Sequence, residues 1–163
     1  MNVKVQMLDS KSFAPYGDVI GPQSRKPAIS APVIEFWPGV SDIKLTSDIA
    51  QLHWLEIKPR PFVSESFERH TQTSEGLFPM KGQSIIVFAL SEDMDDVKSP
   101  IDYSTIKAFI LDGTKAINLK KGVWHDLPFL LTEKADFIVL FEKETHEKDL
   151  EIVELREKVE LIL

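Results

Sequence analysis

The sequence contains no cysteine, no long apolar run and no excess of basic residues. Without cysteine, the chain has no disulfides, thiolate metal ligands or cysteine nucleophile. No stretch approaches the roughly 20 apolar residues of a membrane-spanning helix, and Met1–Gln6 lacks the apolar core of a signal peptide. The net charge of −7, from 26 acidic and 19 basic residues, argues against a nucleic-acid partner. We therefore expect a cytoplasmic protein that binds neither membranes nor nucleic acids.

Short apolar runs bounded by Gly, Pro and Asp are what the chain has in abundance. They lie at Leu52–Ile57, Ile85–Leu90, Ile106–Leu111, Lys115–Leu119, Leu127–Leu131 and Phe137–Phe141. Their Val, Ile, Phe and Trp content favours strands, and the spacing between them is too short for crossover helices. The sequence therefore predicts an all-β sandwich or barrel that is mostly antiparallel.

The N-terminal region predicts a strand, a short helix and a loop. Val3, Val5 and Met7 alternate with polar residues, as in a strand. Ser10 is placed to cap a short helix that ends near Pro15. Residues 21–32 contain three prolines, which indicates a loop.

The C-terminal residues differ in composition from the rest of the chain. We expect a barrel domain at residues 1–141 and a tail at 142–163. Glu142–Asp149 is almost entirely charged and is typical of a solvated connector. Four apolar residues then recur at helical spacing: Ile152, Leu155, Val159 and Ile162. This stripe predicts an amphipathic helix on the barrel or on a partner subunit; a closing strand at Glu151–Leu155 is the alternative.

Candidate site residues gather in two segments that are far apart in the chain. Residues 67–82 contain His70 and Glu75 on an expected strand–turn–strand, and Gly122–His125 supplies a second histidine before a strand. Imidazole and carboxylate groups delivered from separate strands of one barrel form either a metal site or an acid–base pair.

Alternation along a strand assigns neighbouring residues to opposite faces. Glu68 is expected to share an inward polar face with His70, and Arg69 is expected to point outward. Trp124 is a candidate substrate wall, although a core position is the commoner use of a tryptophan.

Three further polar residues could serve either the fold or a site. His53 lies inside an apolar run and is expected to be structural. His146 lies in a charged run and is expected to be solvated. Lys81 is a candidate partner for a substrate carboxylate if its side chain turns inward; otherwise Lys81-Gly82 is a hairpin turn in which the glycine needs a positive φ.

These residues resemble the two signatures of the cupin superfamily. The first signature matches at His70, Glu75 and Gly82, with Glu68 in place of its first histidine. The second matches at Gly113, Gly122 and His125, with Lys120 where a proline is expected. The resemblance implies a cupin-like double-stranded β-helix barrel with short peripheral helices.

A closer resemblance is to the ureidoglycolate lyase family, which has the cupin fold. It covers most of residues 8–141, in the family's order, and is carried by Phe13–Val19, Glu68–His70, Phe78–Gly82, Ala108–Ile110, Val123–His125 and Asp136–Phe137. The resemblance implies a homodimeric enzyme that cleaves the small molecule ureidoglycolate into glyoxylate and urea, in allantoin and purine catabolism.

The resemblance also implies roles for particular residues. His70 or His125 would be the base that removes the hydroxyl proton, and Glu75 would orient a histidine or donate a proton. Glu68, Lys81 and Trp124 would contact the substrate. The set of His70, Glu75 and His125 would also suit one divalent transition metal, and the ligands do not distinguish Ni, Zn and Fe.

Four positions depart from the family pattern. The family has Gln at Glu75, His at Asp126, and an Asn and an Arg where Ser30 and Phe36 stand. An arginine binds a carboxylate through two parallel hydrogen bonds, so its loss leaves the exact substrate open. The alternatives are a cupin that senses a ligand and a metal-dependent isomerase or hydrolase for another hydroxylated metabolite.

Overall fold

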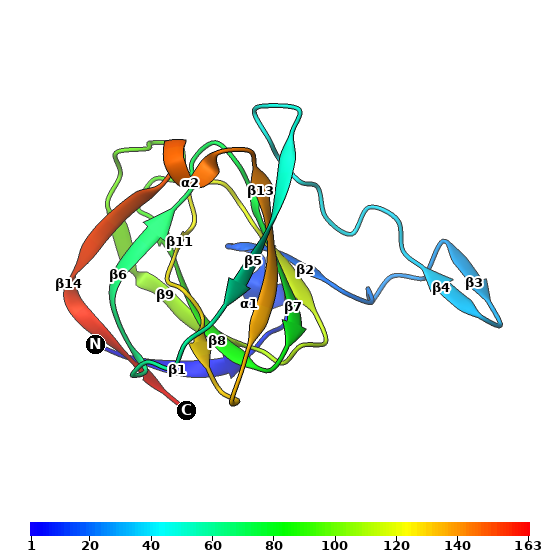
Figure 1. Cartoon of the computed structure of the whole chain (residues 1–163), viewed down its shortest axis with the longest axis horizontal. Coiled ribbons are helices and arrows are strands. Elements are labelled where there is room, and N and C mark those ends of the chain that lie inside the picture. Colours follow the sequence, from blue (N-terminus) through cyan, green and yellow to red (C-terminus); the bar gives the residue numbers. More distant parts are fainter.

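The computed structural model describes all 163 residues and is built mostly of strands (Figure 1). The strands are β1 (Asn2–Met7), β2 (Gly17–Ile20), β3 (Ile29–Ala31), β4 (Ile34–Phe36), β5 (Ala50–Glu56), β6 (Val63–Arg69), β7 (Glu75–Lys81), β8 (Ser84–Ser91), β9 (Ile101–Leu111), β10 (Ala116–Leu119), β11 (Trp124–His125), β12 (Phe129–Leu130), β13 (Asp136–Glu142) and β14 (Glu151–Ile162). The helices are α1 (Ser10–Phe13) and α2 (Thr145–Lys148), and neither is long and apolar enough to span a membrane. The predicted all-β barrel with short helices is confirmed.

The largest sheet closes on itself. Its order is β11-β6-β14-β1-β9-β8-β12, and β11 pairs with β8 as well as with β6. Only the pairings of β1 with β14 and with β9 are parallel, so the expectation of a mostly antiparallel arrangement holds. The other main sheet, β2-β10-β7-β13-β5, lies beside this closed barrel (Figure 1).

Two hydrophobic cores follow from this arrangement. One core takes all its buried residues from strands of the closed sheet, among them Phe67, Val87 and Trp124, and therefore fills the closed barrel. The other combines residues of both sheets, such as Phe88 and Phe137, with Phe13 of α1. Strand β8 is buried on both faces because Val87 points to the first core and Phe88 to the second.

The structure confirms most of the local expectations and corrects the position of one helix cap. Each of the six central apolar runs contains a strand, although Leu127–Leu131 forms one only at Phe129–Leu130, and β1 forms as predicted. Gly82 has φ of 76°, and a Cβ there would lie 1.8 Å from the carbonyl oxygen of Lys134, so only glycine fits this turn. The cap of α1 is Asp9 rather than Ser10, because the Asp9 carboxylate accepts hydrogen bonds from the backbone N–H groups of Lys11 and Ser12, at 3.0 Å each.

The expectation of a loop throughout residues 21–32 is wrong in part. Ile29–Ala31 pairs with Ile34–Phe36 in a separate two-stranded sheet, which extends away from the barrel (Figure 1). The prolines border this hairpin instead of preventing it, since Pro32 lies in its turn.

The helix expected in the tail is also wrong. Glu151–Ile162 is a strand inserted between β6 and β1: it pairs with β6 at Glu151–Glu154 and Val159–Glu160, and with β1 at Glu160–Ile162. Val159 and Leu161, which are two residues apart, point into the closed barrel, whereas Ile152 and Ile162 are 59% and 45% exposed. Val153, Leu155, Val159 and Leu161 keep a period of two on the inward face. Glu157 within this series, and the exposed Ile152 and Ile162 on the other face, hid the strand pattern in the sequence.

The placement of β14 predicts how two adjacent residues respond to truncation. Leu161→Ala should cost about 2–5 kcal/mol of unfolding free energy, because it leaves a cavity in the closed barrel. Ile162→Ala should change stability by no more than about 0.5 kcal/mol, because this side chain faces solvent. Urea denaturation of both variants measures the difference, and a larger cost at Ile162 would contradict the strand.

Candidate active site

The candidate residues of β6 and β11 point toward the second sheet, because side chains alternate between the two faces of a strand. Phe67 and Trp124 point into the core of the closed barrel. Their neighbours Glu68 and His125 therefore face the other way, and they lie opposite each other in the β6–β11 pairing. His70 follows directly after the end of β6, on the side of Glu68.

Glu75, the first residue of β7 on the facing sheet, meets the two histidines. Its Oε2 lies 3.0 Å from Nε2 of His125 and 3.9 Å from Nε2 of His70. On the other side of His125, Oε1 of Glu68 lies 3.5 Å from the same Nε2. His70, Glu75 and His125 are buried. The structure thus brings the two distant sequence segments together around one carboxylate.

Backbone carbonyls fix the orientation of both imidazole rings. Nδ1 of His70 lies 2.6 Å from the carbonyl oxygen of Asp149, and Nδ1 of His125 lies 3.1 Å from that of Val123. A carbonyl oxygen only accepts hydrogen bonds, so each Nδ1 carries a proton. Each Nε2 is therefore directed at the Glu75 carboxylate.

The connector before β14 supports the site as well. The Asp149 carboxylate accepts hydrogen bonds from the backbone N–H groups of Thr71 and Gln72 at 2.9 and 2.7 Å. The residues after His70 are thus held by the same aspartate whose carbonyl orients the ring. The segment expected to be only a solvated connector contributes this support through its last residue.

The three donor atoms fit a divalent cation. They lie within 4.8 Å of one another, and imidazole nitrogen with carboxylate oxygen is a donor set that Zn, Ni and Fe accept. Glu75 Oε2 and His125 Nε2 are buried, and neither has a hydrogen-bond partner of good geometry despite their short separation. Buried polar atoms without partners are rare, and a shared cation would satisfy both.

The charges of these groups are strongly coupled. Burial lowers the pKa of His125, but the carboxylates of Glu75 and Glu68 outweigh it and hold the pKa well above the usual value. Burial raises the pKa of Glu75, but His125 and His70 together hold it below the usual value. Without a metal, Glu75 and His125 therefore form a buried ion pair.

A cavity of about 320 Å³ opens beside these residues. Its lining consists of His53, Trp54, Leu55, Glu68, His70, Glu75, Leu127, Val139, Phe141, His146 and Leu150. His146 is exposed, as expected, yet it contributes to the lining. His53 was expected to be structural, but it also lines this cavity, and no motif in the sequence links it to the other histidines.

Three sequence expectations do not lead to this cavity. Lys81 is exposed at the far end of β7 and is not among the lining residues. Trp124 is a core residue whose Nε1 donates a hydrogen bond to Oγ of Ser91 at 3.0 Å. Arg69, expected to point outward, is 3% exposed; its guanidinium lies 4.1 Å from the centre of a Trp124 ring and pairs with Glu151 at 2.7 Å.

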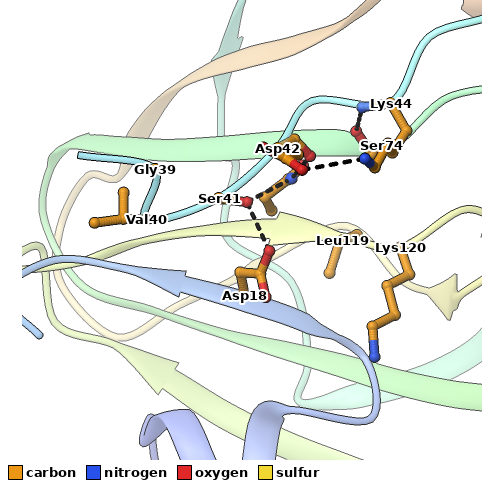
Figure 2. Close-up of a pocket in the computed structure, with 10 residues that line it drawn as sticks. Asp18, Gly39, Val40, Ser41, Asp42, Lys44, Ser74, Leu119 and Lys120 are labelled. Carbon is orange, nitrogen blue, oxygen red and sulfur yellow. Dashed lines mark hydrogen bonds and ion pairs between the residues drawn. The ribbon is translucent and has the colours of Figure 1, made fainter. Parts of the chain in front are cut away.

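A second, polar cavity of about 390 Å³ is lined by residues of β2, of β10 and of the segment after the β3–β4 hairpin (Figure 2). Its residues fasten the segment after the β3–β4 hairpin to the sheet. Oγ of Ser41 donates to Asp18 at 2.8 Å, and the backbone N–H of Lys44 donates to Oγ of Ser74 at 2.9 Å. This cavity contains no histidine, and its hydrogen bonds secure the residue that precedes Glu75.

A comparison with protein families identifies the chain. The model of the family described as ureidoglycolate lyase matches residues 1–162. The chain belongs to the ureidoglycolate lyase family. Among curated relatives of this family, the ureidoglycolate lyase of Salmonella typhimurium is 28% identical over 145 residues, which cover 86% of this chain and 87% of that one. The enzyme of Salmonella enteritidis is 27% identical over the same shares.

Solved structures of sugar-nucleotide enzymes are more distant. The sugar 3,4-ketoisomerase QdtA from Thermoanaerobacterium thermosaccharolyticum is 16% identical with a TM-score of 0.46, over 62% of this chain and 64% of that one. A dTDP sugar isomerase from Desulfovibrio desulfuricans is 14% identical with a TM-score of 0.43, over 83% and 78%. Likenesses this distant assign no chemistry to the chain.

Three of the four departures from the family pattern lie away from the cavity. The carboxylate of Asp126 accepts a hydrogen bond from Oγ of Ser64 at 2.6 Å and pairs with Arg60 at 3.1 Å. Ser30 and Phe36 lie in the β3–β4 hairpin, where they pair with Glu35 and Ile29. Only Glu75 lines the cavity.

The coupled charges predict how stability depends on pH. His125 has a raised pKa in the folded protein, so its ion pair stabilises fully below the unfolded value of about 6.5 and is lost as pH rises through the folded pKa. In chelator-treated protein, the melting temperature should fall above about pH 6.5, and His125→Gln should flatten this part of the profile. Thermal melts from pH 6 to pH 9 test this, and parallel profiles would refute the ion pair.

Proposed function

We propose that this protein is a carbon–nitrogen lyase that cleaves ureidoglycolate into glyoxylate and urea. The observation that carries the proposal is the buried meeting of His70, Glu75 and His125, of which His70 and Glu75 line a cavity, in a chain of the ureidoglycolate lyase family. The substrate carbon carries a hydroxyl, a carboxylate and the ureido nitrogen. Cleavage therefore needs a base for the hydroxyl proton and an acid for the departing nitrogen.

His70 is the proposed base. Its Nδ1–H donates a hydrogen bond to the Asp149 carbonyl, so its Nε2 offers a lone pair on the side of Glu75. When the hydroxyl proton moves to this nitrogen, the oxygen electrons form the C=O bond of glyoxylate. The C–N bond then breaks, and its electron pair stays on the urea nitrogen.

His125 is the proposed acid in the metal-free form. Glu75 and Glu68 raise its pKa, so it carries a proton on Nε2 at neutral pH. Passing this proton through Glu75, which lines the cavity, to the departing nitrogen releases neutral urea. Glu68, at the cavity wall next to His125, is positioned to restore the proton from solvent.

A divalent cation at the same three residues is the metal-assisted form of this proposal. His70, Glu75 and His125 would hold it, and Glu68 would remain as the free carboxylate beside the substrate. A cation bound there would polarise the substrate hydroxyl and lower its pKa. In that form the cation takes the place of the proton shared by Glu75 and His125.

We also propose that the protein acts as a homodimer in the cytoplasm. Large apolar side chains are exposed on the β3–β4 hairpin, including Val33 and Phe36, and on β5, at Leu52. Exposed apolar groups that gather on one element, as on this hairpin, are typical of contacts between proteins. Light scattering of the purified protein measures the oligomeric state.

Replacing His125 should remove the chemistry and leave the fold. We expect His125→Ala to lower kcat by at least about 10²- to 10⁴-fold, the usual contribution of a general acid or base. The assay is glyoxylate release from ureidoglycolate, with circular dichroism to check the fold and the exposed Lys107→Ala as control. Full activity in the folded variant would show that the site lies elsewhere.

Metal content distinguishes the two forms of the mechanism. We expect purified protein to carry about one divalent transition-metal ion per chain and Glu75→Gln to lose most of it, because the variant keeps the shape but not the charge of the ligand. Elemental analysis before and after chelation, combined with the glyoxylate assay, measures both. Activity that persists unchanged in metal-free protein would exclude the metal-assisted form and support the acid–base form.

The same assay separates the lyase from its alternatives. Wild-type protein that binds ureidoglycolate without releasing glyoxylate would be a sensor. Protein that neither binds nor cleaves it would act on another hydroxylated metabolite.

A further inference from the structure

The cavity beside the three site residues has an unusual distribution of charge for a carboxylate substrate. Its lining contains no lysine and no arginine, while Glu68 and Glu75 place two carboxylates at one end. An anionic group at that end would be repelled. The side chains that could donate a hydrogen bond away from the two carboxylates are those of His53, Trp54 and His146.

Among these three, His53 is the one with a buried ring nitrogen that lacks a partner. It lies on β5, and the β5–β13 pairing places it opposite Val139, which also lines the cavity. Its Nε2 is buried and makes no hydrogen bond within the protein. Leaving a buried polar atom unpaired destabilises a fold, so such an atom in a cavity wall indicates a missing ligand group.

Phe141 links His53 to the reacting groups. The ring of His53 packs against Phe141 with 4.5 Å between the ring centres, and the ring of His70 packs against the same phenylalanine at 5.4 Å. The two imidazoles thus pack against the same aromatic ring and line the same cavity. One ligand in that cavity can therefore contact both.

We propose that Nε2 of His53 donates a hydrogen bond to the substrate carboxylate and thereby orients the substrate hydroxyl toward His70. This inference rests on the proposed function, and it gives the cavity two ends with different tasks. His70, Glu75 and His125 act on the carbinol carbon, while His53 binds the charged group attached to it. The hydrogen bond also satisfies the nitrogen that the fold leaves unpaired.

Two substitutions separate hydrogen bonding from packing. His53→Phe keeps an aromatic ring against Phe141 and removes the donor, whereas His53→Gln keeps an N–H donor of similar reach. We expect His53→Phe to raise KM, and the inhibition constant of the product glyoxylate, by about tenfold to a hundredfold, the usual loss for one hydrogen bond to a charged group. His53→Gln should recover much of this loss.

The second product provides the internal control. Urea has no carboxylate, so its inhibition constant should be unchanged in His53→Phe. Glu56→Gln, an exposed position on the same strand, should behave as wild type in every assay. Melting temperatures of all variants check that the cavity is intact.

The outcomes separate this inference from the function on which it rests. If wild-type protein releases no glyoxylate from ureidoglycolate, the proposed function fails. If wild type is active and His53→Phe binds glyoxylate as tightly as wild type, the role of His53 fails alone. An equal loss of glyoxylate and urea binding would also overturn it, because it would indicate damage to the cavity as a whole.

Discussion

The structure depends on a pairing made by only two residues. Strand β11 consists of Trp124 and His125, and it closes the seven-stranded sheet by pairing with β6 on one side and β8 on the other. Because adjacent side chains of a strand point to opposite faces, Trp124 fills the closed barrel and His125 faces the second sheet. A one-residue slip in β11 would exchange the two side chains. The pairing that closes the barrel therefore also places His125 in the site.

A buried negative charge is the electrostatic counterpart of this constraint. Glu75 has been removed from water, and an isolated carboxylate in that position would be expensive. The protein offsets the cost with His125 and His70, whose rings are held in place by backbone carbonyls on their far sides. Carbonyls of the main chain cannot turn away as side chains do, so the Nε2 atoms remain directed at the carboxylate. The same arrangement suits a shared proton and a shared cation, because both are small positive charges.

The sequence predicted the parts of the site that a local motif encodes. His70 and Glu75 share one strand–turn–strand. Gly122 and His125 have the spacing of the second cupin signature. His53 could not be found in this way, because only the pairing of β5 with β13 brings it to the cavity. The carbonyl of Asp149 carries no side-chain signal at all. The strand at 151–162 was misread because exposed Ile152 and Ile162 gave its apolar residues a helical spacing. Its pairing with β6 and β1, which local sequence does not encode, determines its structure.

The departures from the family pattern acquire different weights once the cavity is known. The Asp126 carboxylate binds Ser64 and Arg60. Aspartate in place of the family's histidine at this position therefore changes the packing beside the site and not the reacting groups. The hairpin with Phe36 extends away from the barrel, so an arginine at this position would not reach the cavity of its own chain (Figure 1). Glu75 remains. Where relatives carry a neutral glutamine, this chain buries a charge between two imidazoles, and that charge strengthens its hold on a proton or a metal ion.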